Sequence, residues 1–197
     1  MFSKVVVSVR KAVRFLAVVA IAPLLVCFWV ARLLSGADAA VEGASQFLAC
    51  LPGRVGVLLR AAFFSRVLSK CDPTVFIGYG ALLTKADTRL GKHVYIGPYC
   101  QLGWVSIGDD TLLGPGVQIP SGPKAHTFDR LDIPIRNQPG ESRHVMIGRD
   151  SWIGAGSIVM ADVGDQSVVG AGSVVTKPIP AQSLAAGAPC KPCRSRG

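Results

Sequence analysis

The strongest constraint on this chain is a six-residue repeat that begins after Pro73 and continues almost to the C-terminus. An aliphatic residue is followed by glycine, and a small or β-branched residue stands four positions after the aliphatic one. The pattern occurs nine times, at Ile77-Gly78, Leu90-Gly91, Ile96-Gly97, Leu102-Gly103, Ile107-Gly108, Leu113-Gly114, Ile147-Gly148, Ile153-Gly154 and Val169-Gly170. Self-similarity at a short fixed period is typical of solenoid folds.

Elementary geometry explains why this repeat predicts an all-β fold, a parallel β-helix. Each six-residue unit supplies one short strand and one corner of a three-sided coil, and its aliphatic residue points into the prism. Glycine at the corner lets the backbone turn without a Cβ clash, and the small residue four positions on also faces inward. Because the coils stack, every strand outside the end coils is paired on both sides.

The repeat is interrupted once and then gives way to a different pattern. Residues 120–144 contain no repeat, and a long loop inside a regular domain is usually functional. After Val175 the sequence is rich in proline and small residues, which suits an extended cap. We therefore expect a β-helix domain over residues 71–197, with an inserted loop at 120–144 and a C-terminal cap at 176–197.

Residues 15–31 form an uncharged apolar run of seventeen residues, at the lower edge of the length that spans a bilayer. A cleaved signal peptide is the alternative, but the length of the run, Trp29, Pro23 and the poor cleavage box favour a retained α-helical membrane segment. Pro23 would kink or break a helix, so a re-entrant hairpin also fits.

A second segment, residues 47–67, is too charged to span lipid. The stretch from Val55 to Leu68 fits either an amphipathic helix in the membrane interface or a helix packed on the domain that follows. We assign residues 1–70 to membrane anchoring. This region has nine Lys and Arg residues against two acidic ones, in a chain of net charge +9. The excess suits anionic lipid headgroups, and no nucleic-acid-binding motif accompanies it.

The six cysteines predict neither a disulfide framework nor a metal site. Cys190-Lys-Pro-Cys193 is a single CxxC motif near the C-terminus. A zinc site needs four ligands, and no second motif supplies them. We therefore expect no metal.

The repeats and the C-terminal segments resemble a known family, the hexapeptide-repeat acetyltransferases of the galactoside, maltose and antibiotic acetyltransferase kind. The segments that carry the resemblance are SWIGAGSIVM, VVGAGSVVTKPIP and AAGAPCKPCR, within residues 73–194. The N-terminal segment is similar to that of membrane-associated members that modify sugars for cell-surface polysaccharide or glycolipid. The resemblance implies a left-handed β-helix, a homotrimer with its active site between subunits, and acetyl-CoA as the donor to a sugar-type hydroxyl or amine.

The resemblance also places the family's catalytic histidine at His126, in the loop. Imidazole suits general base catalysis near neutral pH, so His126 would take the acceptor's proton while a backbone N–H stabilises the oxyanion. Asp129 or Glu141 would orient the imidazole or bind the acceptor. Asn137 and Gln138, together with Glu141, are the candidates for the acceptor pocket.

The coils after the loop match the family's coenzyme A groove. The matching residues are Trp152, Gly154, Ala155, Ala171, Thr176, Lys177 and Lys191. By resemblance Trp152 lines the pantetheine, Gly154 and Ala155 lie close to the thioester, and the two lysines meet the phosphates.

Two other functions are weighed against acyl transfer. A γ-type carbonic anhydrase shares this fold but needs a pair of histidines five positions apart, and His93, His126 and His144 include no such pair. A non-catalytic membrane scaffold is the second alternative, against which the histidine-bearing loop argues.

Because acetyl-CoA is a cytosolic donor, we expect the β-helix domain on the cytoplasmic face of a membrane. A single span with the basic N-terminus inside would place it on the opposite face. A hairpin at Pro23, or a return of the chain through the second apolar segment, would reconcile the two expectations.

Overall fold

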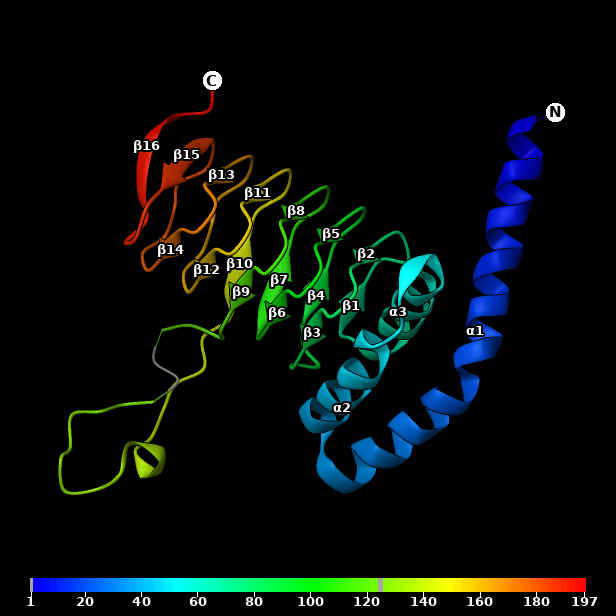
Figure 1. Cartoon of the computed structure of the whole chain (residues 1–197), viewed down its shortest axis with the longest axis horizontal. Coiled ribbons are helices and arrows are strands. Elements are labelled where there is room, and N and C mark those ends of the chain that lie inside the picture. The colour runs from blue at the N-terminus through cyan, green and yellow to red at the C-terminus, as the bar shows by residue number, and fades with distance from the viewer. Residues whose placement is uncertain (1, 124–125) are drawn as a thin grey trace.

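Strands of two to five residues wind into a three-sided coil whose sides are three sheets (Figure 1). Sheet A contains β1 (Lys70–Cys71), β4 (Arg89–Leu90), β7 (Val105–Ile107) and β10 (Val145–Ile147). Sheet B contains β2 (Phe76–Ile77), β5 (Tyr95–Ile96), β8 (Leu112–Leu113), β11 (Trp152–Ile153), β13 (Val168–Val169), β15 (Ser183–Ala186) and β16 (Lys191–Ser195). Sheet C contains β3 (Leu82–Leu83), β6 (Gln101–Leu102), β9 (Gln118–Ile119), β12 (Ile158–Val159) and β14 (Val174–Val175).

This computed structural model describes the backbone of residues 2–123 and 126–197 and, from residue 12 on, their side chains. Neighbouring strands in all three sheets are parallel, except that β16 returns antiparallel to β15 and closes the last coil. The all-β parallel β-helix expected from the repeat is therefore confirmed.

The interior of the coil is filled by the residues that the repeat singled out. The aliphatic residues of the nine pairs are at most 3% exposed, and eight of the nine small residues four positions on are buried as well. The exception is Ser106, because Leu102 and Ile107 are only five residues apart. That shortened unit turns Ser106 outward and lets Val105 fill the interior instead.

The glycines of the repeat are needed for the distance between coils rather than for the turn, which corrects our sequence-based explanation. A Cβ on Gly114 would lie 2.7 Å from the backbone nitrogen of Ala155, and a Cβ on Gly97 would lie 2.8 Å from the carbonyl of Leu113, each on the next coil. The left-handed turn conformation falls two residues later, as at Gly116 with φ 69°. These glycines are therefore a condition of coil stacking.

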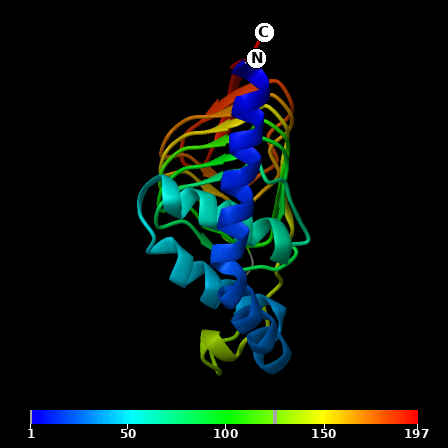
Figure 2. The same cartoon turned by 90° about the vertical axis from the view of Figure 1, so that its right-hand side faces the viewer.

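Three helices cover the open end of the first coil: α1 (Phe2–Ser35), α2 (Ala37–Ala49) and α3 (Gly53–Val67) (Figures 1 and 2). The hairpin broken at Pro23 is absent, since α1 continues through this proline, and Figure 1 shows it as a bent helix. α2 was not foreseen. Residues 12–35 of α1 are long and apolar enough to cross a membrane by length and composition.

α3 packs on the coil, which is the second of the two roles left open for the stretch from Val55 to Leu68. Phe63 and Phe64 are fully buried, and Phe63 meets Phe28 of α1 edge to face at 5.5 Å between ring centroids. α2 is tied to the coil as well, because Ser45 accepts a hydrogen bond of 2.8 Å from the backbone of Leu83.

The junction of the helices with the coil is held by one buried cation. The Arg60 side chain is inaccessible to solvent. Its Nε donates to the Ile77 carbonyl at 2.9 Å, and its Nη1 donates to the carbonyls of Leu48 and Leu51 at 2.8 Å each. Arg60 thereby bonds one carbonyl in the last turn of α2, one in the connection between α2 and α3, and one on the first coil.

We predict that Arg60→Met lowers the free energy of unfolding by about 3 kcal/mol, because buried carbonyls lose a charged donor. Arg54→Met, an exposed arginine on the same helix, should change it by about 0.5 kcal/mol or less. Urea denaturation of the detergent-solubilised chain, followed by circular dichroism, measures both. Equal midpoints for the two variants would contradict this role of Arg60.

Candidate active site

The coil is interrupted once, between β9 and β10, where residues 120–144 leave the corner between sheets C and A (Figure 1). Two backbone hydrogen bonds pair the outgoing and returning strands of this loop. Arg143 donates to Ser121 at 2.7 Å near the coil, and Thr127 donates to Pro139 at 2.8 Å further out. The described residues of these paired segments, 120–123, 126–127 and 139–143, form what we call the stalk.

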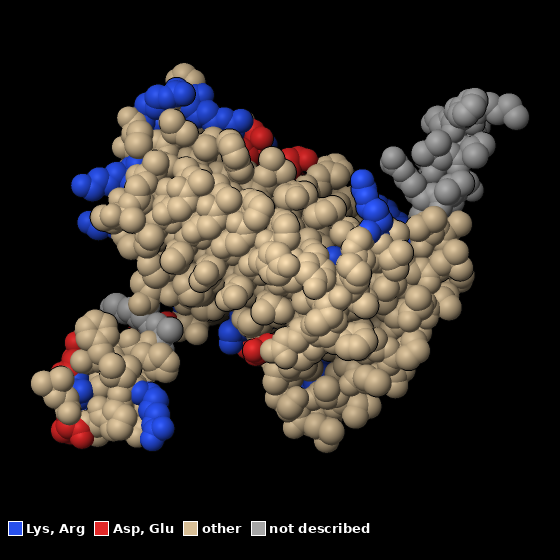
Figure 3. All heavy atoms as spheres, viewed as in Figure 1, with Lys and Arg blue, Asp and Glu red and all other residues tan. Residues whose placement is uncertain are grey.

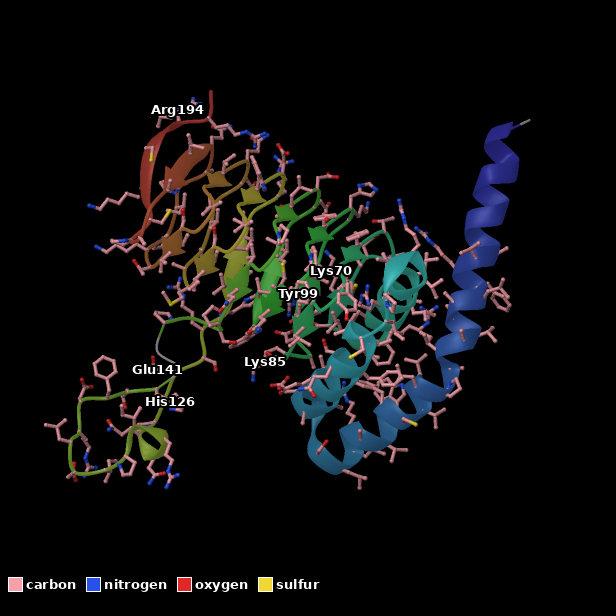
Figure 4. The ribbon with its side chains drawn as sticks, viewed as in Figure 1. Lys70, Lys85, Tyr99, His126, Glu141 and Arg194 are labelled. Atoms are coloured by element: carbon pink, nitrogen blue, oxygen red, sulfur yellow. The ribbon has the colours of Figure 1, made fainter. Side chains whose placement is uncertain are left out.

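His126 lies on this stalk and is exposed. Figure 4 labels His126 on the outgoing segment and Glu141 on the returning segment of the loop that projects from the coils. His126 makes no hydrogen bond to another described residue. The other two histidines are engaged elsewhere: His93 with Asp110 at 3.0 Å, and His144 with Ser106 at 2.9 Å. Among the described residues, His126 is thus the histidine whose ring has no protein hydrogen-bond partner.

Beyond the stalk, the loop is folded around Gln138, which is 5% exposed. Its amide accepts a hydrogen bond from the backbone N–H of Arg130 at 3.2 Å and donates to the carbonyls of Arg130 and Ile133. We expected Gln138 in an acceptor pocket, but the structure commits its side chain to the loop's own backbone. Asp129 and Asn137, by contrast, are exposed.

The outer part of the loop carries apolar side chains that its own chain leaves uncovered. Phe128 is 71% exposed, Leu131 98% and Ile135 56%. Large apolar side chains exposed on a projecting loop are candidates for contact with another molecule.

The residues expected along a coenzyme A groove fall on sheet B and on two corners of the coil. Trp152 is 54% exposed on the outer face of sheet B, paired in register with Leu112 and Val168. Ala155 and Ala171 are exposed and stack on the corner between sheets B and C, where Gly172 donates to the Ala155 carbonyl at 2.8 Å.

Thr176 and Lys177 follow β14 at the corner between sheets C and A, the corner from which the loop emerges two coils earlier. Both are exposed, as is Lys191 on β16. Gly154 differs from the others because it is buried. A Cβ there would lie 2.4 Å from the backbone nitrogen of Ala171, so the structure explains this glycine by coil stacking.

A cavity of about 280 Å³ at the foot of the loop was not found from the sequence. Asp38, Lys85, Asp87, Trp104 and Ser142 line it. The Trp104 indole donates to Asp87 at 3.1 Å, and hydrogen bonds from Ser69 and Trp104 hold the pKa of Asp87 below its usual value. These residues come from α2, two coils and the loop, so no local motif could have revealed the cavity.

No group of three or more His, Cys, Asp or Glu side chains that could hold a metal ion occurs within residues 12–123 and 126–197. Cys190 is buried and Cys193 is exposed.

Two family models match the chain on either side of the loop. Residues 87–121 match the bacterial transferase hexapeptide repeat (six repeats), and residues 144–177 match the hexapeptide repeat of succinyl-transferase. The resemblance stated from the sequence is therefore confirmed for the repeats.

Among curated relatives, the chain is similar to Nodulation protein L of Rhizobium leguminosarum bv. viciae. The two are 44% identical over 82 residues, which cover 39% of this chain and 40% of that protein. The match thus spans less than half of this relative's length.

Solved structures extend the likeness over most of the coil. A maltose O-acetyltransferase from Clostridium difficile 630 superposes with a TM-score of 0.69 and 23% identity, covering 80% of this chain and 87% of that one. A hexapeptide-repeat acetyltransferase of Vibrio cholerae O1 biovar eltor, complexed with acetyl coenzyme A, superposes with a TM-score of 0.68 and 22% identity. That superposition covers 81% of this chain and 87% of that one. At these identities the likeness establishes the fold.

The contacts of Gln138 predict that it fixes the loop. Gln138→Ala should raise the rate of proteolysis within the loop by about tenfold, because three hydrogen bonds that close the loop are lost. Asn137→Ala removes an exposed neighbour and should leave the rate unchanged. Limited proteolysis with mass-spectrometric mapping distinguishes them, and equal rates for both variants would argue against the structural role.

Proposed function

We propose that the chain is an acetyltransferase that moves an acetyl group from acetyl-CoA to a hydroxyl or amine of a sugar-type acceptor. The observation that carries the proposal is the single interruption of the coil, which presents an exposed histidine on a paired stalk. The likeness in fold to acetyltransferases acting on sugars, and to one complexed with acetyl coenzyme A, supports it.

His126 is the general base. Its imidazole accepts the proton of the acceptor, and the acceptor's oxygen or nitrogen forms a bond to the thioester carbonyl carbon. When the tetrahedral intermediate collapses, the carbon–sulfur bond breaks and the proton passes from His126 to the thiolate of coenzyme A. A backbone N–H donates to the oxyanion. Glu141 on the stalk (Figure 4) or Asp129 beyond it, both exposed, orients the imidazole or binds the acceptor.

The donor site lies on the coils after the loop. The exposed small residues Ala155 and Ala171 leave backbone amides open to the pantetheine, and the exposed ammonium groups of Lys177 and Lys191 suit its phosphates. Thr176 lies next to Lys177 at the corner between sheets C and A, and the half-exposed indole of Trp152 offers an apolar wall. These residues fit a donor of this shape and charge.

The acceptor site lies at the foot of the loop. An indole, two carboxylates, an ammonium group and a hydroxyl line the cavity there. Carboxylates accept hydrogen bonds from sugar hydroxyls, and an indole packs against the apolar face of a sugar ring. This chemistry supports a sugar-type acceptor.

The working form is a homotrimer. Sheet B presents a strip of outward apolar side chains in register, formed by Tyr95, Leu112 and Trp152, and the loop presents its own uncovered apolar cluster. Flat faces of identical solenoids pack by closed symmetry. Because the stalk carries His126 away from its own coils, each site takes its base from one copy and its donor groove from a neighbour.

The chain is associated with a membrane through α1, with the β-helix on the cytoplasmic side where acetyl-CoA is available. The length and apolarity of residues 12–35 support this placement. A non-catalytic membrane scaffold is the second candidate, and the same helix favours it. A scaffold function does not account for the exposed histidine on the stalk.

We expect His126→Ala to reduce acyl transfer by at least about a hundredfold, the scale of a lost general base, with coenzyme A binding retained. The assay follows coenzyme A release from acetyl-CoA with purified chain and a panel of mono- and disaccharides that includes maltose. His93→Ala, a histidine held by Asp110 away from the loop, is the matched control. Activity within a few-fold of the unaltered chain would refute the assignment.

We expect two inactive variants to restore activity when they are mixed within one trimer. His126→Ala removes the base, and Ala171→Trp fills the donor groove. Co-expressed at equal amounts, the two should leave about a quarter of the sites intact, because each site draws on two copies. No recovery in co-purified mixed assemblies would contradict a shared site.

A further inference from the structure

One stripe of α1 is packed and the opposite face is bare. Ala17, Ile21 and Phe28 are buried, with Leu24, Leu25 and Ala31 partly buried, and they face α2 and α3. On the other side Phe15 is 67% exposed, Val26 65% and Leu33 86%. Figure 3 shows that the surface over most of α1 carries no charged side chain.

The packed stripe limits how α1 can enter a membrane. It extends from Ala17 to Ala31, which is about 22 Å of helix at 1.5 Å per residue. If this stretch crossed a bilayer, α2 and α3 would be drawn into the acyl chains with it. They carry the exposed charges of Asp38, Glu42 and Arg54, which are costly inside a membrane.

The rest of α1 is too short and too charged to cross by itself. Residues 2–16 make about 22 Å of helix, less than the roughly 30 Å hydrocarbon core. This segment also contains Lys4, Arg10, Lys11 and Arg14.

Positive charge gathers where the packed and unpacked faces of α1 meet. Arg14 of α1 and Arg66 of α3 border a cavity of about 460 Å³ whose apolar lining includes Ala17, Val57 and Val75. At the other end of the helix, the Arg32 guanidinium lies 5.2 Å from the Trp29 ring centroid. Arginines and an indole flanking an apolar face match the headgroup level of an anionic membrane.

We propose that α1 lies in the plane of the membrane, with its bare face among the outer acyl chains and α2 and α3 between it and the coil. The proposal rests on the membrane association put forward above, and it specifies that α1 lies parallel to the bilayer surface instead of spanning the bilayer. Figure 2 shows α1 crossing the end of the coil, so the coil points away from the lipid surface.

This placement removes the conflict between the basic N-terminus and a cytosolic donor. An in-plane helix does not carry the chain across the bilayer, so both termini and the loop stay on one side. No hairpin at Pro23 is required.

Depth measurements test the placement. Val19→Cys, Val26→Cys and Leu33→Cys put spin labels on the bare face of the full chain, with the exposed Cys27, Cys50 and Cys193 replaced by serine. Cys71, Cys100 and Cys190 can stay, because burial raises the pKa of their thiols, to about 12 for Cys71 and about 11 for Cys100. The chain is reconstituted into vesicles of phosphatidylglycerol and phosphatidylcholine. The ratio of each spin label's accessibility to oxygen and to a polar nickel complex then gives the depth of that label in the bilayer.

In the plane of the membrane, all three labels lie at one shallow depth of about 5–10 Å. In a spanning helix the labels at positions 19 and 33 differ in depth by about 21 Å, and this result overturns the proposal. Arg149→Cys, on an exposed side chain of the coil, is the aqueous control. Chain that fails to sediment with vesicles refutes membrane association itself, whereas bound chain with unequal depths refutes only the in-plane placement.

Peptide tags before Met1 and after Gly197 give a second measure in intact cells. Both tags should be protected from added protease and become accessible together after lysis. Cleavage of one tag from outside means that the chain crosses the membrane, which contradicts the proposal.

Discussion

The close approach of one coil to the next is the constraint on which the rest of the structure depends. Strands of two or three residues are too short to be stable as a sheet by themselves, so each must bond to its neighbours on adjacent coils. The backbones can come that close at the corners only where the side chain is absent, since a Cβ at Gly114 or Gly154 would overlap the coil above. Once the coils are stacked, the interior aliphatic residues are sealed from water and the outer faces of the sheets are fixed in register.

A stacked coil must also be closed at both ends, and the chain does this by two different means. At the C-terminus, β16 turns back antiparallel on β15 and ends the pairing. At the other end, α2 and α3 cover the first coil, with Arg60 bonding carbonyls of both the helices and the coil. Because α1 packs on this helical lid, the lid joins the coils to the surface that we propose meets the membrane.

The regular coil holds the one irregular segment to which we assign the catalytic base. The loop leaves and rejoins a fixed corner, so its stalk and His126 are held by the frame while the outer loop is free of its own coils. The exposed Phe128 and Leu131 and the outward strip on sheet B are surfaces that a single copy leaves uncovered. In the homotrimer that we propose, their burial between copies would bring the base of one copy to the donor groove of another.

The sequence by itself determined the β-helix, its interior residues, the position of the loop and the apolar character of α1, because each depends on a local repeat or a local run. Even the departure at Ser106 follows from a unit one residue short. Only the tertiary structure decided that Gln138 closes the loop, that Gly154 serves coil stacking, and that α3 with Arg60 caps the coil. The cavity of Asp87 and Trp104 and the packed stripe of α1 also emerged only there. These features depend on contacts between segments that are far apart in the chain. Such contacts are fixed by the packing of whole helices and coils, so no local sequence pattern indicates them.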